Sequence, residues 1–154
     1  MDGPNLEYST PITLRGEKTV EVTADDLDSL PRVESRFEIV CSSGDRYTET
    51  WQGVPVEGIL EHVTLPEGTT HLLAESTDGY RICVDVLTAL EGILAFSRSG
   101  KPLATDGGYE SRFVAKGIGG PRTAKDVTRI EAMELKPDED PHDYEDFLLD
   151  QRRS

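Results

Sequence analysis

The chain has 154 residues, the length of one domain, and 36% of them are apolar. It carries 30 acidic and 16 basic residues, a net charge of −14, so its surface repels nucleic acid phosphates and anionic lipid. Its apolar stretches are only a few residues long, far short of the roughly 18 that a membrane helix needs. The first residues also lack the basic and apolar segments of a secretory signal. We therefore expect one cytoplasmic domain that binds neither nucleic acid nor membrane.

The basic residues are mostly arginines. High acidic charge with little lysine is typical of proteins from salt-loaded cytoplasms, which predicts a halophilic source; an acidic mesophilic protein is the alternative. Two cysteines, Cys41 and Cys83, make no disulfide framework. The three histidines have no metal-ligand spacing, which argues against a zinc site.

The first half of the chain predicts two hairpins and a capped helix. Alternation of apolar and polar residues indicates four strands: Ile12–Arg15, Thr19–Val22, Arg36–Cys41 and Arg46–Trp51. Thr23 has the side chain and position to cap a short helix over Ala24–Leu30, which carries two aspartates in its first turn.

The second half predicts further short elements. A helix is expected from Pro55 through His62 and another over Asp85–Leu90. Four more strands are expected: His71–Ser76, Tyr80–Val84, Ile93–Ser97 and Thr128–Leu135. Residues 100–120 are rich in loop formers. Strands and short helices without a regular βαβ rhythm favour an α+β domain of mixed sheets over a doubly wound sheet.

Composition changes at Lys136. We predict a domain over residues 1–135 and an acidic C-terminal tail over residues 136–154. The charge of the tail predicts disorder in its first residues, and Tyr144, Phe147 and Leu148 suit a short docking turn.

One window of the chain is basic. Residues 111–129 hold five basic residues and one acidic residue, and they include the segment Gly117-Ile118-Gly119-Gly120. Glycine turns let backbone N–H groups approach a ligand, and guanidinium groups suit a phosphate or carboxylate. This basic window is a candidate anion site. The alternative is a set of arginines paired with surface acids around a flexible loop.

Cys41 ends a predicted strand just before a Ser-Ser-Gly turn. A thiolate at such a position is a soft metal ligand or a nucleophile. A buried, inert cysteine is the alternative. Cys83 lies in the middle of a predicted strand, which indicates a core position.

Several short motifs follow one another in a familiar order. They are a hairpin with a capped Asp-Asp-Leu helix, a strand to Cys41, Trp51-Gln-Gly-Val-Pro, Asp78-Gly-Tyr, Ser99-Gly-Lys-Pro-Leu and a Gly-rich arginine loop. This order resembles the molybdopterin-binding domain shared by sulfite oxidases, assimilatory nitrate reductases and the catalytic subunit of the bacterial methionine sulfoxide reductase. The resemblance covers about residues 12–135.

The resemblance implies a role for individual residues. Cys41 stands at the position of the family's molybdenum-coordinating cysteine, Arg46 resembles an arginine that faces the anionic substrate, and Tyr80 resembles a tyrosine of the substrate pocket. The residues that fall on the segment around the pterin and its phosphate are Arg112, Gly117, Gly119, Arg122 and Lys125. These residues coincide with the basic window found from charge alone.

The chain also departs from the family pattern. Gly107 stands where the family has a histidine near the pterin phosphate, and Asp126 stands where it has an aromatic residue. Only about ten residues precede the first predicted strand, so we expect the family's N-terminal cofactor segment to be missing.

Two functions follow as hypotheses. The first is a mononuclear molybdenum (molybdopterin) oxidoreductase that transfers an oxo group to or from a small oxyanion or sulfoxide, with a redox or completing protein subunit as partner. The second is a cofactor-free relative that binds anions or another protein.

Overall fold

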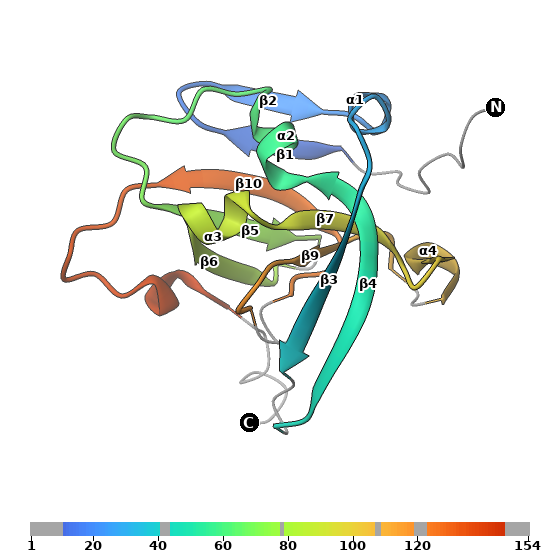
Figure 1. Cartoon of the computed structure of the whole chain (residues 1–154). Helices are drawn as coiled ribbons and strands as arrows, with labels where there is room; N and C mark the ends of the chain where they lie inside the picture. The colour runs from blue at the N-terminus through green and yellow to red at the C-terminus, as the bar shows by residue number, and fades with distance from the viewer. Residues whose placement is uncertain (1–10, 41–43, 78, 107–108, 119–122, 147–154) are drawn as a thin grey trace.

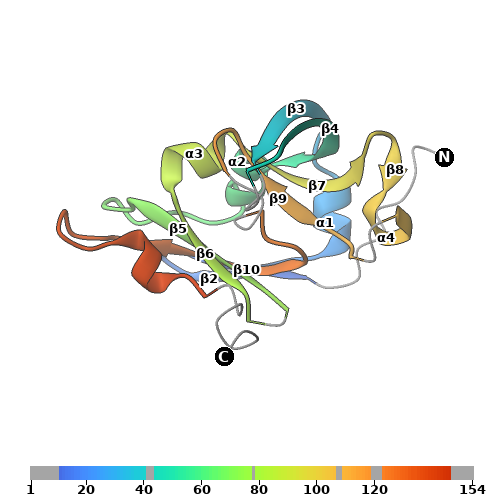
Figure 2. The ribbon, with the colours of Figure 1, turned by 90° about the horizontal axis from the view of Figure 1, so that it is seen from below.

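The computed structural model describes residues 11–40, 44–77, 79–106, 109–118 and 123–146. Its strands form two five-stranded sheets that face each other, as Figures 1 and 2 show. Sheet A has the order β2-β1-β10-β5-β6, and sheet B has the order β3-β4-β7-β8 with β9 also paired to β7. The mixed sheets with short helices confirm the α+β fold class expected from the sequence.

Most strands and helices lie close to their expected positions. Sheet A consists of β1 (Ile12–Arg15), β2 (Thr19–Val22), β5 (His71–Ser76), β6 (Arg81–Asp85) and β10 (Val127–Met133). Sheet B consists of β3 (Val33–Val40), β4 (Arg46–Pro55), β7 (Ile93–Arg98), β8 (Lys101–Pro102) and β9 (Arg112–Val114). The helices are α1 (Ala24–Asp28), α2 (Val56–Leu60), α3 (Val86–Leu90), α4 (Leu103–Asp106) and the 3-10 turn η2 (Pro141–Tyr144).

Two expectations about local structure need correction. The helix expected from Pro55 through His62 is shorter, because Pro55 ends β4 in an extended conformation and α2 begins at the next residue. The segment 100–120, expected as loops, holds β8, α4 and β9. These elements are two to four residues long, too short for hydrophobic periodicity to reveal.

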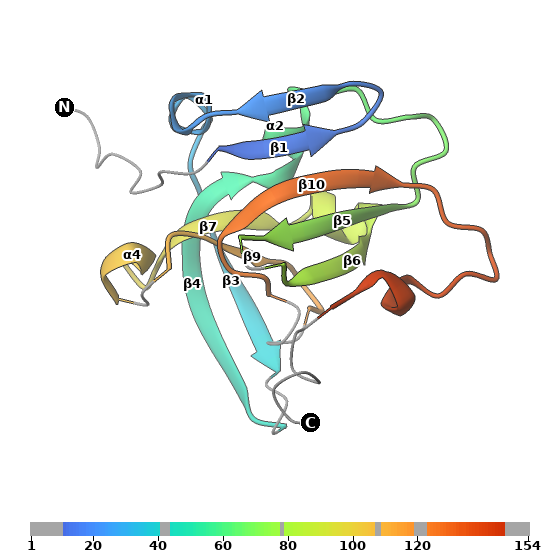
Figure 3. The ribbon, with the colours of Figure 1, turned by 180° about the vertical axis from the view of Figure 1, so that it is seen from behind.

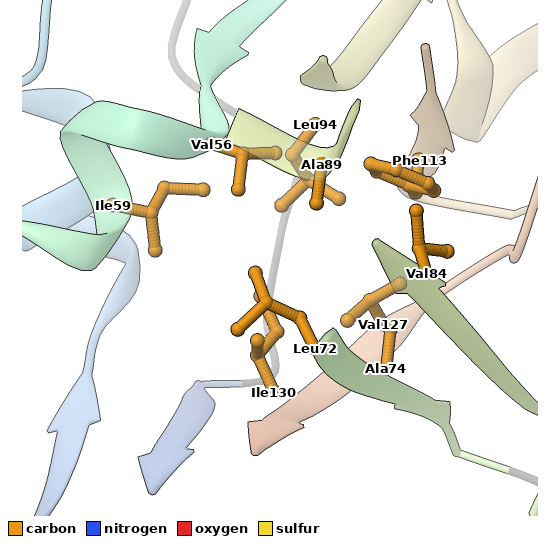
Figure 4. A pocket seen from close by; sticks show the side chains of 10 residues that line it. All are labelled: Val56, Ile59, Leu72, Ala74, Val84, Ala89, Leu94, Phe113, Val127 and Ile130. Carbon is orange, nitrogen blue, oxygen red and sulfur yellow. The ribbon is translucent and has the colours of Figure 1, made fainter. Parts of the chain in front are cut away.

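The main core lies between the two sheets. β1, β5, β6 and β10 contribute from sheet A, and Leu94, Phe96 and Phe113 contribute from sheet B. This core contains a cavity of about 20 Å³. Figure 4 shows the ten aliphatic and aromatic side chains that line it. The cavity is wholly apolar and has room for about one water molecule, so we assign it to packing and place the functional site elsewhere.

A second, smaller core covers the opposite face of sheet B. We call it the minor core; it contains Phe37, Ile39, Trp51, Ile93, Ala95, Leu103 and Val114. Alternate residues of β7 and β9 serve the two cores, because successive strand side chains point to opposite faces. The basic window therefore reaches both faces of sheet B through β9.

The described part of the C-terminal tail docks on the edge of sheet A, where Figure 1 shows η2 beside β6. Arg81 and Asp146 exchange two backbone hydrogen bonds, of 2.8 and 3.0 Å. The carboxylate of Glu145 also accepts a hydrogen bond from the backbone N–H of Cys83 at 2.9 Å. The expected docking turn thus involves Tyr144, at the end of η2, while Phe147 and Leu148 lie outside the described residues.

The start of the tail is hydrogen-bonded, in contrast to the expected disorder. The carboxylate of Glu139 accepts bonds from the backbone N–H of Lys136 and from the hydroxyl of Tyr144, both at 2.7 Å. Both bonds hold the pKa of the Glu139 carboxyl below its usual value, and the bond from Lys136 has the larger effect. The domain boundary at residue 135 stays a prediction. Within the described residues, no helix is long and apolar enough to cross a membrane.

Candidate anion-binding site

Arg112 is the first residue of β9, and two side-chain hydrogen bonds anchor its guanidinium. Its Nε donates a hydrogen bond to Oγ1 of Thr123 at 2.8 Å, and its Nη1 donates to the hydroxyl of Tyr109 at 3.2 Å. Thr123 is 3% exposed, so this acceptor is fixed inside the protein. The guanidinium is therefore held in one orientation while the side chain stays partly exposed.

Trp51 forms the floor of the site. The indole is fully buried, and its ring centre lies 5.4 Å from Cζ of Arg112 and 5.8 Å from Cζ of Arg98, distances typical of cation–π contacts. Sheet pairing explains this arrangement. Trp51 on β4 pairs with Arg98 on β7, and Arg112 on β9 pairs with Ala95 on the other edge of β7. The buried Nε1 of Trp51 has no hydrogen-bond partner among the described residues.

Tyr109 brings a second cation to the same place. The Nζ of Lys125 lies 4.8 Å from the centre of the Tyr109 ring, and the hydroxyl of that ring accepts the bond from Arg112. Arg112 and Lys125 also form an isolated antiparallel bridge through their backbones. The structure thus brings together two of the five residues predicted to hold an anionic cofactor.

Neither Arg112 nor Lys125 forms an ion pair with a carboxylate in the described part of the chain, although acidic residues outnumber basic ones by 30 to 16. Other arginines are paired: Arg32 with Asp28 at 2.8 Å, Arg46 with Glu38 at 3.6 Å and Arg129 with Glu131 at 3.5 Å. The positive charge of Arg112 and Lys125 is therefore available to an anion.

Asp126 connects the strands around this site. Its carboxylate accepts hydrogen bonds from the backbone N–H groups of Glu110, at 2.7 Å, and Ser111, at 3.3 Å. Its own N–H donates to the carbonyl of Ser111, and its carbonyl accepts from the N–H of Thr77. Asp126 has a φ of 53°, an unusual conformation that aspartate tolerates better than most residues.

Gly117 lies in the turn that follows β9. Its φ of 82° belongs to the left-handed region, and the space around its α-carbon is open. The backbone there is exposed, as is Lys116 beside it. The turn is thus accessible to a ligand, and the role that the resemblance implies for Gly117 stays a prediction.

Tyr80 and Arg46 lie apart from Arg112 and Lys125. Tyr80 precedes β6 and packs against the main core, so sheet B separates it from the face that carries Trp51. Arg46 begins β4 opposite Val40, with 67% of its side chain exposed. The structure does not gather all the predicted catalytic and cofactor residues around one point.

Cys41, Gly119 and Arg122 lie outside the described residues, as does Gly107. Their roles stay predictions. Cys83 has the predicted core position, with 1% of its surface exposed in β6. Among the described residues, no group of three or more histidine, cysteine or acidic side chains is placed to hold a metal ion.

Sequence reasoning missed several residues of the site: Trp51, Arg98, Tyr109 and Thr123. Trp51 was noticed only as part of a fold motif. Its contact with Arg112 depends on strand pairing across β7 between residues far apart in the sequence. The one local indication was the aromatic residue at position 109, three residues before Arg112.

Comparisons with known proteins agree with this fold. The profile of a family described as "Oxidoreductase molybdopterin binding domain" matches residues 3–140. Among solved structures, the chain is similar to the sulfane dehydrogenase SoxCD from Paracoccus pantotrophus, with a TM-score of 0.74 and 20% identity. That alignment covers 90% of this chain and 41% of the other, a likeness in fold. A comparison with curated proteins found no match. The match over residues 3–140 shows that the chain belongs to the oxidoreductase molybdopterin-binding domain family.

Proposed function

We propose that the chain holds a molybdopterin cofactor and is a mononuclear molybdenum oxidoreductase, acting by oxo transfer on a small oxyanion or sulfoxide. One observation carries the proposal. A domain of this family keeps Arg112 and Lys125 side by side and without a carboxylate partner in the described part of an otherwise acidic chain. A protein of net charge −14 attracts anions only where such cations are concentrated.

The described residues fit an anionic cofactor. Among the described residues, Arg112 makes contacts through Nε and Nη1, and Nη2 would donate to a phosphate oxygen. The ammonium of Lys125 contacts the Tyr109 ring and has three N–H donors. The open turn at Gly117 adds backbone that a ligand can approach. We propose that Arg122 and Gly119 also contact the cofactor.

The remaining roles follow from side-chain chemistry. When bound, the molybdenum cofactor supplies two-electron oxo-transfer chemistry that side chains lack. Cys41 would provide a thiolate, a soft ligand for the metal. Arg46 would attract an anionic substrate; its contact with Glu38 is long and exposed, so little energy holds it there. Tyr80 would donate a hydrogen bond to substrate oxygen. We also propose that a partner protein exchanges electrons with this chain.

Metal content tests the assignment. Protein made in a cofactor-competent, high-salt host is analysed for molybdenum by mass spectrometry and for pterin by fluorescence after acid oxidation. We expect near-stoichiometric molybdenum in the wild type and in Cys83→Ala, the matched control for loss of a cysteine. We expect Cys41→Ser to lose the metal and any oxo-transfer activity.

Two results would overturn the proposal: molybdenum or activity retained in Cys41→Ser, or a folded wild type that never acquires the metal. In the second case, retained binding of inorganic phosphate would identify a cofactor-free, anion-binding relative.

A further inference from the structure

We propose that Asp126 is a positioning residue of the anion site, which fixes Arg112 and Lys125 through the loop that carries Tyr109. This inference rests on the proposed function and deepens it. The anion concerned is of the phosphate type, because two adjacent cations without carboxylate partners in the described part of the chain suit a doubly charged oxyanion.

The carboxylate of Asp126 acts on the loop before β9. It accepts from the backbone N–H groups of Glu110 and Ser111, the two residues between Tyr109 and Arg112. Hydrogen bonds to an ionised acceptor are stronger than neutral ones. The loop is therefore held where the Tyr109 hydroxyl meets Arg112 and the Tyr109 ring meets Lys125.

The main chain of Asp126 acts on a second segment. Its carbonyl accepts from the N–H of Thr77 at 3.2 Å, at the start of the turn that leads from β5 to Tyr80. One residue thus ties the loop beside Arg112 to the turn that precedes Tyr80. A φ of 53° at a residue other than glycine persists only where the surrounding contacts enforce it.

The negative charge of Asp126 lets an experiment distinguish a positioning role from a purely electrostatic effect on the anion. A carboxylate next to an anion site repels the anion, so its removal should strengthen binding if charge alone matters. If Asp126 positions the cations instead, removing its side chain weakens binding. An asparagine keeps one acceptor oxygen and tolerates positive φ, so it should rescue most of the affinity.

The experiment compares Asp126→Gly and Asp126→Asn with Asp138→Gly and Asp138→Asn. Asp138 is exposed in the C-terminal segment, so its variants remove the same charge away from the site. Glycine at position 126 avoids backbone strain at positive φ. Binding of inorganic phosphate to the full chain is measured by calorimetry at constant ionic strength, with thermal melting as the check of folding.

We expect Asp126→Gly to weaken phosphate binding by about tenfold, because a displaced cation loses about one charge-assisted hydrogen bond to the anion. Asp126→Asn should stay within about threefold of the wild type, and the Asp138 variants should bind at least as tightly as the wild type. Emission from Trp51 without ligand should shift in Asp126→Gly but not in Asp126→Asn, because Arg112 contacts the indole.

Unchanged or tighter phosphate binding in Asp126→Gly overturns the inference, as does an equal loss in Asp126→Asn or no phosphate binding by the wild type. The proposed function is judged separately. A wild type without molybdenum whose phosphate affinity still depends on Asp126 refutes the function and supports the inference. If Asp126→Gly loads molybdenum and binds phosphate normally, the inference is refuted and the proposed function is supported.

Discussion

The guanidinium of Arg112 lies 5.4 Å from the ring centre of Trp51, and Trp51 is the chain's single tryptophan. The intrinsic fluorescence of the protein therefore comes from an indole in contact with the candidate site. Because Trp51 is fully buried in the minor core, the same emission also reports unfolding. Site geometry and stability can thus be followed with one optical signal.

Arg112→Gln should destabilise the fold by about 1–2 kcal/mol, because a partly desolvated cation–π contact is lost. The emission of Trp51 in the folded state should change as well. Denaturant titration followed by tryptophan fluorescence measures both effects. Arg36→Gln is the control, since Arg36 is exposed on β3, and it should change stability by less than about 0.5 kcal/mol. Equal effects of the two variants would contradict a structural contact between Arg112 and Trp51.

Lys125→Gln should reduce phosphate affinity by about three- to tenfold, because one of two adjacent cations is removed. Lys18→Gln removes the same charge from an exposed position in the turn between β1 and β2, on the other sheet, and should have little effect. Calorimetric titration with inorganic phosphate measures the difference. If Lys18→Gln weakens binding as much as Lys125→Gln does, net charge rather than a local site controls anion binding.

Gly53→Ala should destabilise the protein by about 3 kcal/mol or more, because the inserted methyl group collides with packed backbone. A Cβ at this position would lie 2.0 Å from the carbonyl oxygen of Leu94 on β7. In Gly58→Ala the nearest atom is 3.6 Å away, in Pro55, and alanine favours helix α2, so stability should rise by about 0.5–1 kcal/mol. Thermal or chemical denaturation compares the pair, and a tolerated Gly53→Ala would refute the close packing of β4 against β7.

Asp26 should make folding stability depend on pH at the acid end. The backbone N–H of Thr23 donates to its carboxylate, which with the Thr23 side chain holds the pKa of Asp26 below its usual 3.8. A lowered folded-state pKa gives stability that is present above the unfolded value and lost as pH falls through the folded value. The stability advantage of the wild type over Asp26→Asn should therefore shrink as the pH falls below about 4. Thermal melts over this range test it, and a pH-independent difference would contradict it.

Much of the fold was predictable because its information is local. Thr23 caps α1 with the reciprocal hydrogen bonds of a capping box, and Asp85 caps α3. The bounds of β1, β2 and β5 agree with the alternation of apolar and polar residues. These features depend on side chains within a few positions of one another, which a sequence pattern records directly.

The arrangement of the candidate site was not predictable in the same way. Charge counting marked the basic window, but it could not tell Arg112, which stacks on Trp51, from Arg129, which pairs with Glu131. That difference arises from strand pairing between distant segments. Asp126 was noted only as a departure from the family pattern, because its bonds to Glu110 and Ser111 exist only once the two loops meet.

The position of β10 has a consequence for the order of folding. Figure 3 shows β10 between β1, its parallel partner, and β5, its antiparallel partner, although it is the last strand among the described residues. During synthesis, the β1–β2 and β5–β6 hairpins emerge before the strand that joins them. We expect the nascent chain to expose two unpaired strand edges until residues 127–133 leave the ribosome, and folding to be slowed by these long-range pairings.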